Sequence, residues 1–361
     1  MQPSFIDDLI PLILGAHDHL WTSDLRALCL VSRSWHHFAS KQLYQQPELR
    51  SYKACTQLAR TFQGNHTLET CITSLDIRPD GNQRADMQAI RYLLGLKGIT
   101  SLKLGGKLAH QTERFLHLVS HPQDVQSLHI DGATQDFQSS LTCGPPAAFE
   151  WDEALAFKFH NLRHLRLASL ELEIVYPSTP YHLPLQSLSL DNVVIDGELP
   201  WLAHKSWAEL DSLSITTCNE AESNLHVKQM ITCCRNMRKL RYEVKYRSNA
   251  QDPIFDADVP NCTSMREVAL GGRFDLPLLE TVSQYCPSLE VLVVLGRSAV
   301  TPVQWKGFLE GQRVSNLMKE LVIPLATYTA PFQFQWSDGD VSSVRDVCMK
   351  RRIQLLTSGL R

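Results

Sequence analysis

The chain of 361 residues has no hydrophobic run as long as the ~18–20 residues that a membrane-spanning helix needs. Its longest early apolar stretch, 9–16, follows Asp7 and Asp8. No Lys or Arg precedes that stretch, whereas a secretory signal has a basic flank there. We therefore expect neither a membrane span nor a signal peptide.

An excess of basic charge is also missing. The sequence has 35 Lys and Arg against 38 Asp and Glu, which gives a formal net charge of −3. This balance does not suggest a surface for a polyanion, so we expect no nucleic-acid partner.

Its 10 cysteines include no CxxC pair. Without a secretory signal they are expected to be reduced and mostly buried, in a cytoplasmic or nuclear protein.

Motifs that carry chemistry are scarce. His117 and His121 have i,i+4 spacing, as do His160 and His164, but no Cys or carboxylate accompanies them at a spacing suited to zinc. No glycine pair extends to a dinucleotide-binding or P-loop motif, and no GxSxG elbow occurs. We expect no enzyme activity, no metal and no cofactor.

Leucine, in contrast, is abundant, with 52 residues or about one in seven. The pattern apolar-x-x-apolar-x-apolar recurs ten times at spacings of 23 to 29 residues, apart from one gap of 37. The last two apolar positions of the ten copies are Leu75/Ile77, Leu102/Leu104, Leu128/Ile130, Leu165/Leu167, Leu188/Leu190, Leu213/Ile215, Leu240/Tyr242, Val268/Leu270, Leu292/Val294 and Leu321/Ile323.

Each copy predicts a short strand, because its last two apolar positions alternate. Segments between the copies have helical spacing, for example 85–96 and 276–286. A strand and a helix cannot bury their apolar faces alone, but stacked neighbours can. We therefore predict an α/β fold, a curved solenoid with parallel strands inside and helices outside.

This pattern resembles the leucine-rich repeat family over about residues 68–325. The Asn or Cys that follows the strand in the family is matched at Cys218. The gap of 37 residues contains an insertion at about 141–152, which includes Trp151. Insertions in solenoids loop out, so we expect an exposed loop there.

The first fifty residues carry a different pattern, typical of three short helices. Ser23 is a suitable N-cap for the second helix. The apolar stripes of the second and third helices are expected at Leu25, Leu28, Cys29, Trp35, Phe38, Ala39 and Leu43. A core of this size is marginal alone, so such a segment often gains stability from a partner.

This segment resembles an F-box, above all in Leu30-Val-Ser-Arg-Ser-Trp35. Further matches are Asp8, Leu9, Ile10, Ile13, Leu14, Asp24, Leu25 and Ala39. Ile6 departs from the family, which has Pro there, and Pro11 falls inside the first helix. If Asp8 is the N-cap, Pro11 costs little stability. The whole chain thus resembles F-box proteins of the fungal type with carboxy-terminal leucine-rich repeats.

The resemblance implies a substrate-recognition adaptor in a Skp–cullin–F-box ubiquitin ligase, which directs ubiquitin-dependent degradation. Its helices would bind a Skp-family linker, and through it a cullin, by apolar anchors in a groove. The expected anchors are Leu9, Ile10, Ile13, Leu14, Leu25, Val31 and Trp35. Trp35 could equally fill the three-helix core. The alternative function is a leucine-rich-repeat scaffold for protein–protein interaction without ligase association.

The concave strand positions are the candidate binding site for an unknown protein substrate. Lys103, His129, Arg166 and Arg241 suit an acidic or phosphorylated segment, while Val291 and Val293 suggest an apolar patch. Two alternatives are a merely solvated face and coverage of the patch by the tail, with its amphipathic stretch 341–356. We therefore divide the chain into a three-helix segment (1–50), a solenoid of about ten irregular repeats (51–325) and a tail with a capping helix (326–361).

Overall fold

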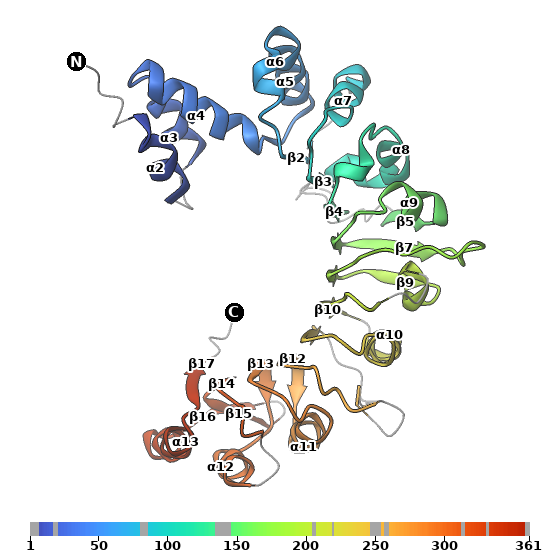
Figure 1. Cartoon of the computed structure of the whole chain (residues 1–361). Coiled ribbons are helices and arrows are strands. Elements are labelled where there is room, and N and C mark those ends of the chain that lie inside the picture. Colours follow the sequence, from blue (N-terminus) through green and yellow to red (C-terminus); the bar gives the residue numbers. More distant parts are fainter. Residues whose placement is uncertain are drawn as a thin grey trace. The chain divides into compact units, whose positions relative to one another are not determined.

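The computed structural model describes residues 7–16, 21–79, 86–133, 146–203, 207–218, 220–245, 254–255, 260–311, 315–329 and 332–357 (Figure 1). The chain forms two compact units. The first comprises Met1–Phe149 and Phe157–Leu162, and the second Glu150–Ala156 and Arg163–Arg361. In the described residues, no helix has the length and apolar character to cross a membrane.

The first unit begins with the three-helix segment. Its helices are α2 (Ile10–Ala16), α3 (Thr22–Leu28) and α4 (Arg33–Gln45). Pro11 is the second residue of α2, where the missing N–H group needs no helical acceptor. The prediction of Ser23 as N-cap is wrong, because α3 already begins at Thr22. The Asp24 carboxylate instead accepts a hydrogen bond from the Trp21 N–H, at 3.0 Å.

A parallel sheet follows, in the strand order β1-β2-β3-β4. The strands are β1 (Glu48–Leu49), β2 (Ser74–Ile77), β3 (Ser101–Gly105) and β4 (Ser127–Asp131), and the helices are α5 (Tyr52–Gly64), α6 (His66–Glu69), α7 (Met87–Leu94) and α8 (Thr112–His117). Leu75, Leu102 and Leu128 are Cα partners in one row, as the repeat requires. The sheet begins at β1, before the first predicted repeat.

The second unit continues the same arrangement. Its main sheet has the order β6-β8-β10-β11-β12-β13-β14-β17. These strands are β6 (His164–Ala168), β8 (Ser187–Asp191), β10 (Ser212–Thr217), β11 (Lys239–Val244), β12 (Glu267–Phe274), β13 (Val291–Ser298), β14 (Glu320–Ile323) and β17 (Gln354–Thr357). Helices α10 (Glu220–Cys233), α11 (Leu276–Tyr285), α12 (Pro302–Glu310) and α13 (Asp338–Lys350) lie on one side of these strands (Figure 1).

Register confirms the predicted stacking of parallel strands. Leu165, Leu188 and Leu213 are consecutive Cα partners, and the row continues through Leu240 to Leu321. Every one of the ten predicted strand copies is therefore a strand, and the leucine pattern also predicted which residues pair. We call the side of each sheet that carries no helices the helix-free face.

The insertion before the fourth predicted copy is not simply an exposed loop. Residues 134–145 lie outside the described part, but β5 (Ala147–Trp151) is a strand in a small sheet with β7 (Leu170–Ile174) and β9 (Val194–Asp196). Trp151 is fully buried, and its indole N–H donates a hydrogen bond to the carbonyl of Leu202 at 3.0 Å. The prediction of an exposed Trp151 is wrong.

The Glu153 carboxylate links α9 (Glu153–Lys158) to the segment that follows β7. Glu153, at the start of α9, accepts hydrogen bonds from the hydroxyl and N–H groups of both Ser178 and Thr179, at 2.8 to 3.1 Å. These bonds stabilise the charged form, so the hydroxyl of Ser178 first, and then the Thr179 groups, hold the pKa of Glu153 below its ordinary value.

The lowered pKa predicts a pH-dependent stability that Glu153→Gln removes. A depressed pKa stabilises the fold above the ordinary carboxyl range, and that contribution is lost as pH falls through the folded pKa. The melting temperature of E153Q should lie below that of wild type at pH 7, and the gap should narrow at pH 3, below the ordinary carboxyl pKa. Glu171→Gln on the exposed face of β7 serves as the matched control. A gap that stays constant between the two pH values would contradict the prediction.

The tail adds a further helix and strand to the repeats, where the sequence predicted only a capping helix. Helix α13 ends at Lys350, and β17 then pairs with β14, so the predicted amphipathic stretch 341–356 is not one helix. A hairpin of β15 (Ala326–Thr329) and β16 (Phe332–Gln335) precedes α13. Because β17 lies beside β14 in the plane of the sheet, the described part of the tail extends the helix-free face instead of covering it.

Candidate protein-interaction surfaces

The three-helix segment has a small core of its own. Ile10, Leu14, Leu25 and Ala39 are buried, and Trp35 packs half-buried against them. Ile10, Leu14 and Leu25 are thus unavailable to a partner in this structure, which corrects their assignment as linker anchors. The contact of Trp35 with this core matches the core role that the sequence left open.

The other predicted anchors face solvent. Leu9, Ile13 and Val31 are exposed, the last by 62% of its side-chain reference area. Leu30 beside it is 88% exposed. Both lie in an ordered turn between α3 and α4, because the N–H groups of Leu30 and Val31 donate to the carbonyls of Ala27 and Leu28 at 3.0 and 3.1 Å.

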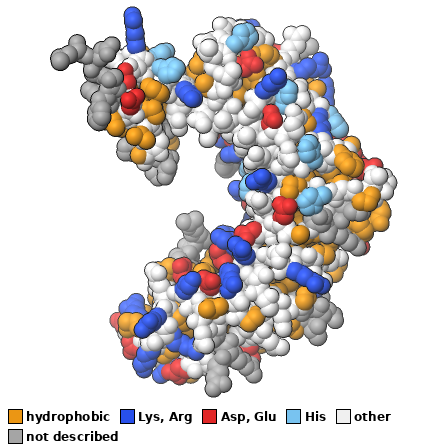
Figure 2. Space-filling model, viewed as in Figure 1, with side chains coloured by type: hydrophobic (Ala, Val, Ile, Leu, Met, Phe, Trp, Pro, Cys, Tyr) orange, Lys and Arg blue, Asp and Glu red, His pale blue; other side chains and the backbone are white. Residues whose placement is uncertain are grey.

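Sequence analysis missed three further exposed apolar side chains of this segment, namely Leu12, Trp21 and Leu30. For Leu12 a signal was present, because α2 has more apolar residues than one buried stripe can take. With Leu9, Ile13 and Val31, these three are the exposed large apolar side chains of the three-helix segment in the described residues. Figure 2 shows hydrophobic side chains over the N-terminal helices. Exposed apolar patches of this kind mark interaction sites.

On the helix-free face of the first unit, several charged side chains form ion pairs with one another. Asp76 is buried, and its Oδ1 lies 2.8 Å from Nε of Arg78. Arg78 also approaches Asp131, at 3.5 Å. The predicted residues Lys103 and His129 follow Asp76 in one row of Cα partners that starts at Glu48, and both are half-buried.

Gly105 makes this arrangement of Arg78 feasible. A Cβ on Gly105 would lie 2.9 Å from Cγ of Arg78, too close for a real contact. Since Gly105 and Asp131 are Cα partners, the Arg78 side chain passes over β3 to reach β4. Three strands are therefore linked by one side chain.

The second unit brings its predicted residues into one row of Cα partners. In strand order from β6 to β17 the row contains Arg166, Ser189, Ser214, Arg241, Ala269, Val293, Val322 and Leu356. Arg166 is exposed, whereas Arg241 lies 3.1 Å from Glu243 on its own strand. Val291 lies two residues before Val293 on β13, so it faces the same side of the sheet. It is half-buried between its Cα partners Glu267 and Glu320.

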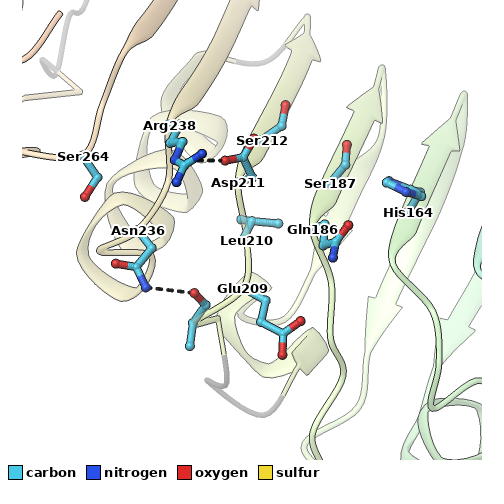
Figure 3. Close-up of a pocket in the computed structure, with 11 residues that line it drawn as sticks. His164, Gln186, Ser187, Glu209, Leu210, Asp211, Ser212, Asn236, Arg238 and Ser264 are labelled. Carbon is cyan, nitrogen blue, oxygen red and sulfur yellow. Dashed lines mark hydrogen bonds and ion pairs between the residues drawn. The ribbon is translucent and has the colours of Figure 1, made fainter.

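A groove of about 630 Å³ lies at the amino-terminal ends of β6, β8 and β10 (Figure 3). Its acidic side chains already have basic partners. Asp211 lies 3.6 Å from Arg238, and Glu209 lies 3.4 Å from Nε2 of His182. Asn236 donates to the carbonyl of Ala208 at 3.0 Å. The groove therefore presents mainly hydroxyl and amide groups, which suit a polar segment rather than catalysis.

The thiols are less buried than predicted. Among the nine cysteines in the described part, four are buried and only Cys218 is exposed. Burial raises the pKa of Cys55 and Cys348 to about 11, so these thiols stay protonated. Within the same part of the chain, no group of three or more His, Cys, Asp or Glu side chains is placed to hold a metal ion.

Comparisons with known proteins add little. No family model and no curated protein matches the chain. Several solved structures are similar to it. One of them, an internalin from Listeria monocytogenes, shares 11% identity and a TM-score of 0.34, over 99% of this chain and 91% of the other. A likeness at this level assigns neither a family nor a function, and the fold rests on the register of this chain's own strands.

Proposed function

We propose that this chain is a non-catalytic substrate-recognition adaptor of a Skp–cullin–F-box ubiquitin ligase, working in the cytoplasm or nucleus. Residues 1–50 bind the Skp-family linker, and the repeats bind the protein to be ubiquitinated. The observation that carries the proposal is the exposed turn at Leu30 and Val31. It lies within the most specific part of the F-box resemblance, on a segment whose own core is already filled.

The exposure pattern supports binding by apolar anchors. A helical segment that only capped the repeats would turn its apolar residues toward them. Here Trp21, Leu30 and Val31 instead remain in solvent, each exposed by more than 60%. Large apolar anchors of this kind, Trp above all, dominate the affinity of many protein interfaces.

A second candidate is a leucine-rich-repeat scaffold without ligase association. The observation in its favour is that the end of α4 joins the sheet directly. The Thr73 N–H donates to the carbonyl of Gln45 at 2.9 Å, and β1 pairs with β2. In that function the three-helix segment would serve as an end cap.

Direct binding separates the two candidates. The purified full chain should bind a Skp-family linker in isothermal titration calorimetry with a dissociation constant of about a micromolar or tighter, about −8 kcal/mol. A shortened chain that begins at Arg50, and so lacks the three-helix segment and β1, should not bind the linker. If the folded full chain fails to bind the linker at micromolar concentration, the adaptor function is wrong and the scaffold function remains.

A further inference from the structure

The helix-free face of the second unit changes its chemistry along one row. At β6 the row begins with the cation of Arg166, and at β13 and β14 it presents Val293 and Val322. All of these strands belong to one unit and pair in register, so the distance between the two ends of the row is fixed by the sheet.

At the polar end, Arg166 is the available cation. It is exposed, and in the described residues it makes no ion pair, whereas the next arginine of the row, Arg241, is held by Glu243 at 3.1 Å. A guanidinium matches the two oxygens of a carboxylate. Phosphorylated motifs are bound by clusters of arginines, so a single available guanidinium favours one Asp or Glu side chain.

At the apolar end, Val293 and Val322 are half-exposed, and Leu356 on β17 is 37% exposed. Most of the charges that border this end are paired with one another. Lys239 lies 3.3 Å from Glu267, and Glu290 lies 3.7 Å from Arg266 and also binds Lys319. Glu320, the Cα partner of Val291, makes no ion pair in the described residues and disfavours an acidic ligand group here, so this end fits an uncharged aliphatic side chain.

Mostly short side chains connect the two ends. Between Arg166 and Val293 the row contains Ser189, Ser214, Arg241 and Ala269. The one long side chain, that of Arg241, is paired with Glu243 on its own strand. From β6 to β13 there are five strand spacings, which at about 4.8 Å each amount to about 24 Å. An extended chain advances about 3.3 Å per residue, so about seven residues span this distance.

We propose that the helix-free face of the second unit binds an extended segment of a partner protein at two points. A carboxylate of the segment pairs with Arg166, and an aliphatic residue about seven positions away packs on Val293 and Val322. The inference rests on the proposed function only in taking this partner to be the ubiquitination target. It adds the chemistry and spacing by which the target is recognised.

Peptide display tests the spacing. A library of 18-residue peptides with one fixed central Glu and all other positions random is selected on the immobilised full chain. We expect Leu, Ile or Val to be enriched six to eight positions from the Glu, on one side or the other. A selection that enriches nothing, or enriches aliphatic residues at no fixed distance, overturns the proposal.

Variants assign the two contact points. The best selected peptide should bind Arg166→Ala at least tenfold more weakly in fluorescence anisotropy, while its Glu→Gln version should bind R166A and wild type equally. Val293→Thr with Val322→Thr keeps side-chain shape and should weaken both peptides at least fivefold. Arg345→Ala, on exposed α13, is the matched control and should change nothing. Equal binding of the peptide to R166A and wild type overturns the proposal.

Two further measurements distinguish this two-point site from a phosphate-binding site and from the proposed ligase function. A peptide with phosphoserine in place of Glu should bind no more tightly, and tenfold tighter binding would overturn the carboxylate assignment. R166A and V293T/V322T should retain wild-type binding to a Skp-family linker. If the linker never binds but the peptides behave as expected, the ligase function fails and the two-point site stands.

Discussion

Replacing both Leu30 and Val31 with Asp should abolish capture of a Skp-family linker while leaving the fold intact. Both side chains are exposed, in a turn held by its own backbone hydrogen bonds, so the substitutions remove little contact within the chain. In a complex they would bury two carboxylates in an apolar groove, which costs several kcal/mol. We expect linker affinity to fall at least ~100-fold, a loss of ~3 kcal/mol.

The matched control is Val303→Asp with Leu317→Asp in the second unit. These residues are also large, apolar and exposed, so the variant adds the same charge away from the three-helix segment. Its linker affinity and its circular dichroism spectrum should match those of wild type. Unchanged linker affinity in L30D/V31D would remove the turn from the interface and with it the main support for the proposed function.

Trp151→Ala should destabilise the chain by ~3–5 kcal/mol, the range for truncating a large buried aromatic residue. Trp151 is fully buried in the small sheet, and the substitution also leaves the Leu202 carbonyl without the indole N–H. Urea unfolding followed by circular dichroism measures the change. Trp21→Ala, the same substitution at a residue that is 75% exposed, should change stability by less than ~0.5 kcal/mol.

The difference between W151A and W21A also tests whether the insertion places Trp151 in the core. If Trp151 lay in an exposed loop, as its sequence neighbourhood suggested, W151A and W21A would be equally mild. A loss of stability below ~1 kcal/mol in W151A would therefore contradict its place in the core.

The repeats could be predicted because their pairing is encoded locally. Leu240 and Tyr242 alternate with polar residues, so they show which side of their strand is buried, and the same pattern in the neighbouring copies fixes the register. The strand β1 has only two residues, and β17 does not carry the full repeat pattern, so neither was predicted.

Exposure in the three-helix segment could not be predicted in the same way. Helix α2 has apolar residues on all sides, so periodicity does not show that Ile10 and Leu14 are buried while Leu12 and Ile13 face solvent. Only the position of α4 decides it, since Ala39 there lets α2 approach closely.

The tail differs from the predicted amphipathic stretch 341–356 because its backbone turns after α13. Helix α13 ends at Lys350, and Arg352 then adopts a φ of +60°, in the left-handed region. Nothing in an arginine marks such a turn, because Gly and Asn are the residues that favour it. The apolar residues after it, Leu355 and Leu356, therefore resembled a continuing helix, although they belong to a strand.

The path of Arg78 over Gly105 bears on how the first unit opens. Its guanidinium pairs with Asp76 on β2, the strand that Arg78 directly follows, and reaches Asp131 on β4, so moving β4 away from β2 breaks the contact with Asp131. Arrays held only by nearest-neighbour interfaces can fray one repeat at a time. Here a contact that skips a repeat couples three of them, and their amide protons should exchange with solvent as one cooperative block.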